Sequence, residues 1–198
     1  MTPPTHALTI DTVQPGRMAA LLEAAQREVH TPPAGRTLLG CWSAEFGRLN
    51  QLFRLWSTAP AGDGGCAALE RPAVLRQREE RLLVARRPVL TDLPGAWIYE
   101  LRRYRLAHGR RDEFLDLLLD HFELRETWSK AVGLWVPLDG DLNEVLHLWP
   151  FRDLAHRAQV RAASGAHPVW EAYRQRVLPL LEQQDAALLA PVTFSPLR

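Results

Sequence analysis

The stretch GLWVPLDGDLNEVLHLW, residues 133–149, is a diverged copy of GCWSAEFGRLNQLFRLW, residues 40–56. Aligned without a gap at a shift of 93 residues, the two share seven identities in seventeen columns, where chance would give about one. Both begin with Gly-x-Trp and end with Leu-Trp, so four of the seven tryptophans form two repeat pairs. A repeat of this kind predicts two homologous units in one chain.

The repeat sets the predicted domain boundaries. The same shift brings Leu8 onto Leu101 and Gly16 onto Gly109 upstream of the matched stretches. We therefore predict a divergent first unit over residues 1–91, a linker over residues 92–96 and a second unit over residues 97–198. The linker contains a Pro-Gly pair, which is typical of a turn.

Each unit has the pattern of a ferredoxin-like β-α-β-β-α-β fold. In the second unit, strands are predicted at 98–106, 131–137, 142–149 and 189–194, and helices at 110–126, 153–163 and from Pro168 onward. In the first unit, strands are predicted at 7–13, 37–43, 49–57 and 86–90, and helices at 17–30 and 67–85. Two such sheets can bury their open faces against each other, which predicts an α+β fold with an intrachain pseudo-dimeric barrel.

Composition excludes several classes of function. Lys plus Arg number 24 and Asp plus Glu 23, so a net charge of +1 argues against nucleic acid or an anionic membrane as the partner. No apolar run is long enough for a transmembrane helix, and the first residues do not follow a signal-peptide pattern. With only two cysteines, we expect a cytoplasmic protein, and a single lysine among the basic residues suggests a GC-rich bacterial genome.

Polar residues concentrate in the second unit. Alternation along strand 98–106 places Glu100, Arg102 and Tyr104 on one face, and alternation along the later strand does the same for His147 and its neighbours. At the equivalent positions the first unit has Ala7, Thr9, Asp11 and Arg54. This asymmetry predicts one working pocket, between the sheet and the helices of the second unit.

We predict His147 and Glu100 as catalytic residues, with His147 as the general acid or base and Glu100 as the group that orients it. Arg102 would bind an acidic ligand group. The remaining predicted substrate-binding residues are Tyr104, Trp135, Asn143, Trp149, His167, Trp170 and Tyr173. Each has a structural alternative: an ion pair for Glu100 and Arg102, a hydrogen-bonded strand histidine for His147, a turn for Asn143, capping or loop packing for His167 and core packing for the aromatic residues.

Motifs for cofactors and metals are missing from the sequence. It contains no GxSxG, no GxxxxGK[ST] and no GxGxxG, and we expect neither a metal nor an organic cofactor. The glycine-rich stretch Ala59–Gly65 is predicted to be a flexible loop.

The second unit resembles the NIPSNAP family. The strand IYELRRYRL at residues 98–106 resembles the family's opening IYELRTYRL strand, and the blocks GLW at 133–135, LNEVLHLW at 142–149 and FSPLR at 194–198 follow in the family's order. The resemblance spans residues 97–198, and residues 7–90 resemble the same family more weakly. It implies a dimeric α+β barrel and a family without one settled biochemical activity.

These observations lead to three hypotheses of function. The first is an enzyme that acts on a small apolar or aromatic metabolite by cofactor-independent acid–base chemistry, such as isomerisation, cyclisation or oxygenation. The second is a non-catalytic protein that binds a ligand or interacts as an oligomer, and under either hypothesis we expect a homo-oligomer. The third is haem binding through His147.

Overall fold

The strands of the structure close into one barrel. The structure, a computed structural model, describes residues 5–59, 67–93 and 95–198, so the predicted loop lies outside it beyond residue 59. The strands are β1 (Thr5–Val13), β2 (Arg36–Phe46), β3 (Gln51–Thr58), β4 (Leu75–Ala85), β5 (Ile98–Leu106), β6 (Gly133–Pro137), β7 (Glu144–Phe151) and β8 (Leu181–Pro191). Around the barrel they follow the order β1-β3-β2-β8-β5-β7-β6-β4, and each strand is antiparallel to its neighbours.

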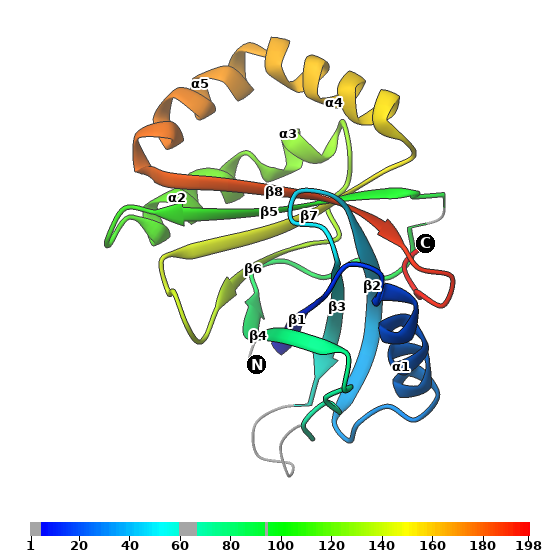
Figure 1. Ribbon diagram of the computed structural model, residues 1–198. Coiled ribbons are helices and arrows are strands. Elements are labelled where there is room, and N and C mark those ends of the chain that lie inside the picture. The colour runs from blue at the N-terminus through cyan, green and yellow to red at the C-terminus, as the bar shows by residue number, and fades with distance from the viewer. Residues whose placement is uncertain (1–4, 60–66, 94) are drawn as a thin grey trace.

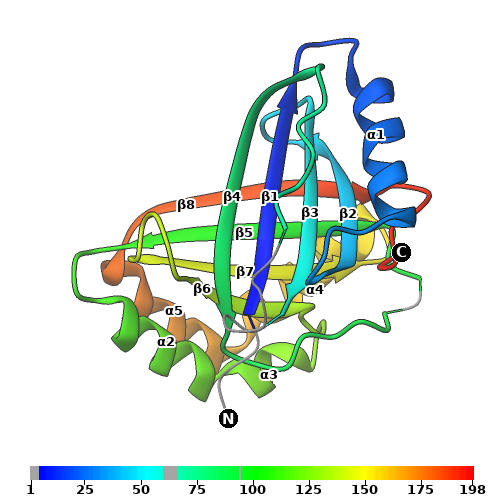
Figure 2. The same cartoon turned by 90° about the horizontal axis from the view of Figure 1, so that it is seen from below.

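The two halves of the barrel repeat each other. The first half-sheet has the order β4-β1-β3-β2 and the second the order β8-β5-β7-β6, and they join where β2 pairs with β8 and β4 pairs with β6. β5 and β7 begin 93 residues after β1 and β3, which is the shift of the sequence repeat. Figure 2 shows the strands of one half crossing those of the other. The predicted α+β barrel is therefore confirmed.

Apolar side chains from both halves fill the barrel. Tyr99 of β5 and Leu146 of β7 are among the alternate residues that point inward. Trp42 of β2 and Trp135 of β6 join them, and each indole lies against the glycine two residues earlier, where a methyl group would clash. The space left among these side chains is about 10 Å³, so the interior is a packed core.

Helices cover the outer face of each half-sheet (Figure 1). The first half has α1 (Met18–His30), and the second has α2 (Arg111–Asp120), α3 (Phe122–Glu126), α4 (Leu154–Ala166) and α5 (Pro168–Val177). The predicted helix 110–126 is thus interrupted at His121, and Pro168 opens a helix as predicted. α4 and α5 form an arch over the sheet, and a short 3₁₀ turn (Leu178–Leu180) then leads into β8, which begins eight residues before its predicted start.

The prediction for residues 67–90 is wrong. Residues 75–85 form strand β4 where a helix was expected, and the predicted strand 86–90 lies beyond its end. The sequence LRQREERLLVA is rich in helix-forming residues, but β4 closes the sheet by pairing with both β1 and β6. Its register places Leu83 and Ala85 in the barrel core and the charged residues elsewhere on the strand. Tertiary pairing has overridden local helix propensity.

Candidate functional site

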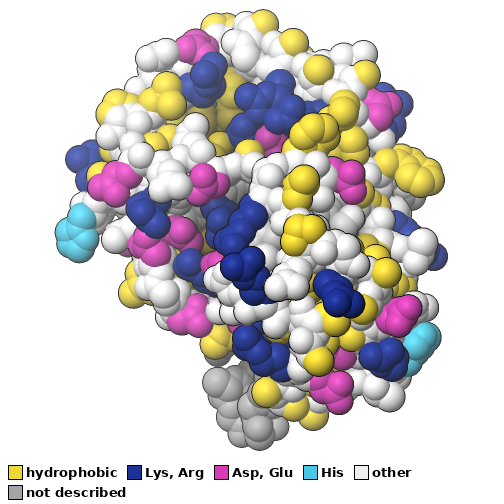
Figure 3. Space-filling model, viewed as in Figure 1, with side chains coloured by type: hydrophobic (Ala, Val, Ile, Leu, Met, Phe, Trp, Pro, Cys, Tyr) yellow, Lys and Arg dark blue, Asp and Glu magenta, His cyan; other side chains and the backbone are white. Residues whose placement is uncertain are grey.

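A cavity of about 220 Å³ lies between the outer face of the second half-sheet and the helices above it. Strands β5, β7 and β8 form its floor, and α2, α3, α4 and α5 contribute its walls and roof. Figure 3 shows the hollow beneath the α4–α5 arch, with hydrophobic and basic side chains around it. Seven of the ten predicted site residues line this cavity: Glu100, Arg102, Tyr104, His147, Trp149, Trp170 and Tyr173.

The pairing of β5 with β7 brings the polar residues together. Arg102 lies directly opposite His147, and Glu100 lies opposite Trp149. Side chains opposite one another in an antiparallel pair are close neighbours on the same face. Arg102 also donates from Nη1 to the hydroxyl of Tyr104 at 2.7 Å. The period-2 pattern of two separate strands therefore produces one cluster on the sheet.

Glu100 is a buried carboxylate surrounded by arginines. Its Oε1 accepts a hydrogen bond from Nη2 of Arg157 at 2.7 Å and lies 3.4 Å from Nε of Arg102 and 3.6 Å from Nη1 of Arg161. Burial opposes ionisation, but the Arg157 hydrogen bond and the three positive charges outweigh it and lower the pKa of Glu100. Glu100 is therefore ionised at neutral pH. The structural alternative for Glu100 and Arg102, an ion pair, is present in the structure.

His147 is oriented by Trp149 and not, as predicted, by Glu100. The indole Nε1 of Trp149 donates to Nδ1 of His147. In a neutral imidazole this leaves the proton on Nε2, which has no hydrogen-bond partner among the described residues. Burial, and then the charges of Arg102 and Arg125, lower the pKa of His147 well below its ordinary value of 6.5. His147 therefore offers the cavity a neutral N–H donor rather than a base.

Arg125 of α3 is a site residue that the sequence analysis missed. Its guanidinium carbon lies 4.0 Å from the centre of the Trp149 ring, and its side chain is 9% exposed. Burial, and then the charge of Arg102, lower its pKa to about 10, so it remains charged at neutral pH. The available signal was a basic residue in helical register with Phe114 and Leu118, on a stripe that is otherwise apolar.

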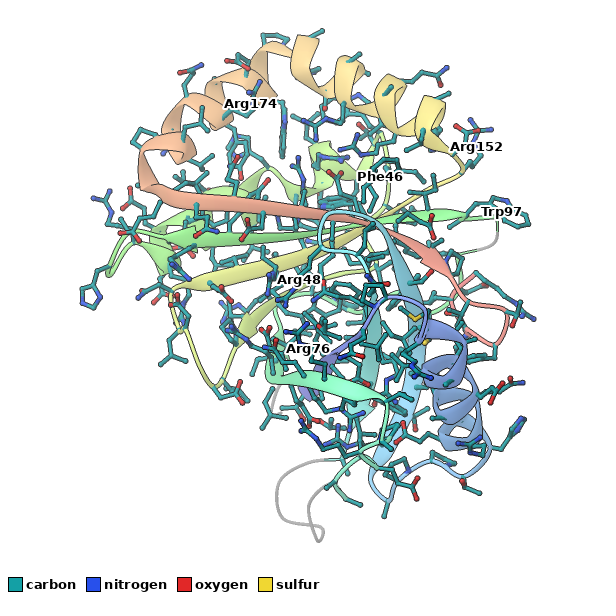
Figure 4. All side chains as sticks on the ribbon, viewed as in Figure 1. Phe46, Arg48, Arg76, Trp97, Arg152 and Arg174 are labelled. Carbon is teal, nitrogen blue, oxygen red and sulfur yellow. The ribbon has the colours of Figure 1, made fainter. Side chains whose placement is uncertain are left out.

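Further lining residues come from the helices and β8. Phe114, Leu118 and Val177 belong to apolar helical stripes, which predict burial but not a cavity. The exposed helical residues of the lining have no distinctive pattern until the arch is placed over the sheet. The additional residues are Phe114, Leu118, Arg161, Ser164, Gly165, Arg174, Val177, Leu178, Leu181 and Gln184. Figure 4 marks Arg174 on α5 and Arg152 just before α4, at opposite ends of the arch.

Three predicted site residues lie elsewhere. Trp135 points into the barrel core, because alternation along β6 places it on the inner face. Asn143 belongs to the turn before β7, where its backbone N–H is bound by Asp141 and its carbonyl accepts from Leu106. His167 is the residue between α4 and α5, with its ring edge-on to Trp128. The turn alternative describes Asn143, and packing against Trp128 describes His167, whose side chain makes no capping hydrogen bond to α5.

The equivalent cleft of the first half contains a buried ion-pair network. Arg54, at the position of His147, donates to Asp11 at 2.6 Å and also to Glu28 of α1. Arg78 of β4 binds the same Asp11 from Nε and Nη2 at 2.6 and 2.8 Å. Asp11 occupies the position of Tyr104 in the repeat. The charges of the first-half network therefore satisfy one another, whereas Arg125 beside the second-half cavity has no ion pair among the described residues.

Neither a group of metal ligands nor a membrane-spanning helix is found among the described residues. Over residues 5–59, 67–93 and 95–198, no three His, Cys, Asp or Glu side chains are grouped so that they could hold a metal ion. In the same ranges, no helix combines the length and apolar character needed to cross a bilayer.

The fold and the cavity together define an α+β-barrel protein whose two half-sheets lie in one chain and whose two clefts differ. The sequence pattern of the NIPSNAP family matches residues 10–62 and 99–196. The chain belongs to the NIPSNAP family.

Two animal proteins illustrate the similarity to family members. The chain is 28% identical over 182 residues to NipSnap homolog 2 of Mus musculus, a match that covers 82% of this chain and 63% of the mouse protein. It is 28% identical over 199 residues to NipSnap homolog 1 of Danio rerio, which covers 90% of this chain and 70% of that protein. The chain thus spans less than two thirds of the length of the mouse relative.

Solved structures match the chain in two ways. A NIPSNAP family protein from Agrobacterium tumefaciens is 28% identical, with a TM-score of 0.51, and the match covers 56% of this chain but 98% of that one. The match to an anthrone oxidase-like protein covers 98% of this chain and 94% of that protein, with a TM-score of 0.71 at 12% identity. The match to a putative monooxygenase from Lactobacillus acidophilus covers 96% of this chain and 94% of that protein, with a TM-score of 0.68 at 10% identity. At these identities, the last two share the barrel fold alone.

Proposed function

We propose that the second-half cavity binds a small apolar or aromatic metabolite and that the protein acts on it without an organic cofactor. The observation that carries this proposal is the open cavity itself. It lies where the sequence concentrates polar residues, while the equivalent cleft of the first half contains paired charges. Its volume of about 220 Å³ is below the roughly 300–1,000 Å³ typical of drug-sized ligands, which favours a single-ring or similarly small molecule.

The geometry favours charge stabilisation as the chemistry. The Nε2–H of His147 and the nearby guanidinium of Arg102 are donors that would stabilise negative charge developing on a ligand oxygen, as in an enolisation step of an isomerase. A neutral histidine is suited to that role, because it donates without carrying a full charge. The same cavity is small for a porphyrin, which weakens the haem hypothesis.

Non-catalytic ligand binding is the second candidate, and one observation favours it. The pKa values of His147 and Glu100 are both shifted away from neutrality, whereas an efficient general acid or base has a pKa near the working pH. Binding and turnover are separated by incubating a bound ligand with the protein and following its NMR spectrum for a product.

Ligand binding itself is tested with a cavity-filling variant. Ser164 is buried and lines the cavity, so Ser164→Leu extends a larger side chain into the space, while Ser164→Ala leaves it open. We expect ligand-observed NMR with single-ring fragments to give hits that bind wild type and Ser164→Ala but not Ser164→Leu. Circular dichroism checks that both variants are folded. Hits that bind all three proteins equally would count against the cavity as the ligand site.

A further inference from the structure

We propose that the cavity takes a small organic acid, with the carboxylate bound by Arg125 and His147 and the apolar or aromatic body against α2 and α5. This inference rests on the proposed function, since it names the ligand class of the same cavity. It goes further in assigning which end of the ligand lies where, and in giving a role to a residue from α3.

Two buried donor groups of the cavity have no hydrogen bond and no neighbouring carboxylate among the described residues, whereas a third, Nε of Arg102, makes no hydrogen bond but lies 3.4 Å from Oε1 of Glu100. Nη1 of Arg125 and Nε2 of His147 make no hydrogen bond to any described residue, although both side chains are buried and line the cavity. Buried donors in native proteins are almost always hydrogen-bonded, so two in one cavity indicate a missing acceptor. The two groups share Trp149, whose ring stacks against Arg125 and whose Nε1 donates to His147.

The charge balance of the cavity calls for an anion. Among the described lining residues, four are arginines and one is a carboxylate: Arg102, Arg125, Arg161, Arg174 and Glu100. Arg174 pairs with Glu171 of its own helix at 2.7 Å, which leaves three lining arginines beside the one lining carboxylate. Glu100 is engaged by Arg157 in addition to Arg102 and Arg161. No ion pair of Arg125 is found in the described part of the chain, so its buried charge stays uncompensated. A carboxylate has two adjacent acceptor oxygens and the opposite charge, which matches an arginine donor beside an imidazole N–H.

Another part of the cavity lining is apolar and suits the rest of the molecule. Phe114 and Leu118 of α2 face the same space as Trp170, Tyr173 and Val177 of α5. Aromatic walls bind flat or branched hydrocarbon groups well. The polar and apolar sides together describe a compact acid with one carboxylate and one ring or short branched chain.

The test compares acids with their amides, which have nearly the same shape and no charge. Isothermal titration calorimetry at pH 7 uses phenylacetate, benzoate and isovalerate, each beside its amide, and inorganic phosphate as a second anion. We expect at least one acid to bind, and to bind tenfold or more tightly than its amide. Arg125→Gln should weaken that acid about 10- to 100-fold, the effect of one or two charge-assisted hydrogen bonds, and leave the amide unchanged within about threefold.

Arg176→Gln is the matched control. Arg176 is exposed on α5 and does not line the cavity, so this substitution removes the same charge without changing the cavity. Arg176→Gln should change neither the affinity for the acid nor the affinity for its amide. His147→Gln keeps an acceptor for Trp149 and serves as a second test, with a smaller expected loss, if Arg125→Gln does not fold.

The failures of the two proposals are distinguishable. Amides that bind as tightly as acids, and that Ser164→Leu excludes, would show a small-molecule cavity and overturn the organic-acid assignment. Phosphate that binds more tightly than every acid, with the same dependence on Arg125, overturns it in favour of a phosphorylated ligand. If no acid or amide binds, and the NMR screen gives no hit that Ser164→Leu excludes, both proposals are wrong.

Discussion

Arg54 and Arg125 are buried arginines in opposite electrostatic surroundings. Arg54 binds Asp11 and Glu28, whereas Arg125 is stacked on Trp149 with no ion pair among the described residues. A buried, uncompensated charge is costly to stability and is usual at sites where function needs it. The two residues therefore provide a matched pair for separating structural from functional roles.

Substituting each arginine by methionine should change stability in different directions. Arg54→Met removes a partner from two buried carboxylates and should lower the free energy of unfolding by about 3–5 kcal/mol. Arg125→Met keeps apolar contact with Trp149 and removes an unpaired charge, so stability should stay unchanged or rise. Urea denaturation measures both. A loss at Arg125 as large as that at Arg54 would show that Arg125 is a structural residue.

His147 should make stability depend on pH. The unfolded imidazole takes up a proton near pH 6.5, while the folded one has a pKa well below this value and stays neutral. The contribution of neutral His147 to the free energy of unfolding is therefore fully present above pH 6.5. It is lost as the pH falls below that value, by about 1.4 kcal/mol per pH unit. In urea titrations from pH 7.5 to 5, wild type should lose more stability than His147→Gln. Parallel curves would contradict the neutral, buried imidazole.

The strand residues of the cavity could be predicted from the sequence, because their positions follow from the regular geometry of a strand. Alternation along a strand is strict, so the faces of Glu100, Arg102 and Tyr104 could be predicted before their neighbours were known. Hydrogen-bond partners depend on distances between elements, and these could not be predicted. Hence Trp149, expected only as a wall, orients His147, and Arg125 from a separate helix completes the cluster.

At the scale of elements, strand β4 shows the limit of local pattern. Its residues favour a helix in isolation, yet the half-sheet needs a fourth strand beside β1. The strands of the second half were predicted more closely, because β5 and β7 carry β-branched, aromatic and alternating residues. The described part of the first half has no counterpart of α4 and α5, and the sequence repeat ends just before the position where they would begin.

The Gly-x-Trp elements should tolerate no side chain at the glycine. A Cβ at Gly133 of β6 would meet the ring of Trp135, so Gly133→Ala should destabilise the protein by about 1–3 kcal/mol through overpacking. Gly165 of α4 has open space around its Cβ position, and Gly165→Ala should be neutral or stabilising by up to about 1 kcal/mol. Thermal unfolding of both variants compares them, and equal melting temperatures would contradict the proposed role of the glycine.

At the scale of the whole molecule, neither half-sheet is complete alone. The barrel core combines Leu8 and Phe53 of the first half with Leu101 and Leu148 of the second. Each half would otherwise expose an apolar sheet face. The division into units at residues 1–91 and 97–198 stays a prediction, as does the homo-oligomer.

Residues 97–198 expressed alone should therefore form a homodimer. Two copies can pair the same sheet faces that the full chain buries internally, and a solved NIPSNAP relative of about half this length supports such a unit. Size-exclusion chromatography with light scattering gives the mass of the fragment beside that of the full chain. A folded, stable monomer of the fragment would contradict this prediction.

Under the proposed function, the ion pairs of Arg54 also limit the number of ligands that one barrel binds. A barrel built from two identical chains carries two identical clefts, and every substitution alters both at once. Here the described residues leave one cleft open per barrel, so titrations should give a stoichiometry of one and a simple hyperbola without cooperativity. Duplication within one gene thus separates two selective pressures: the first half can evolve for stability and the second for recognition.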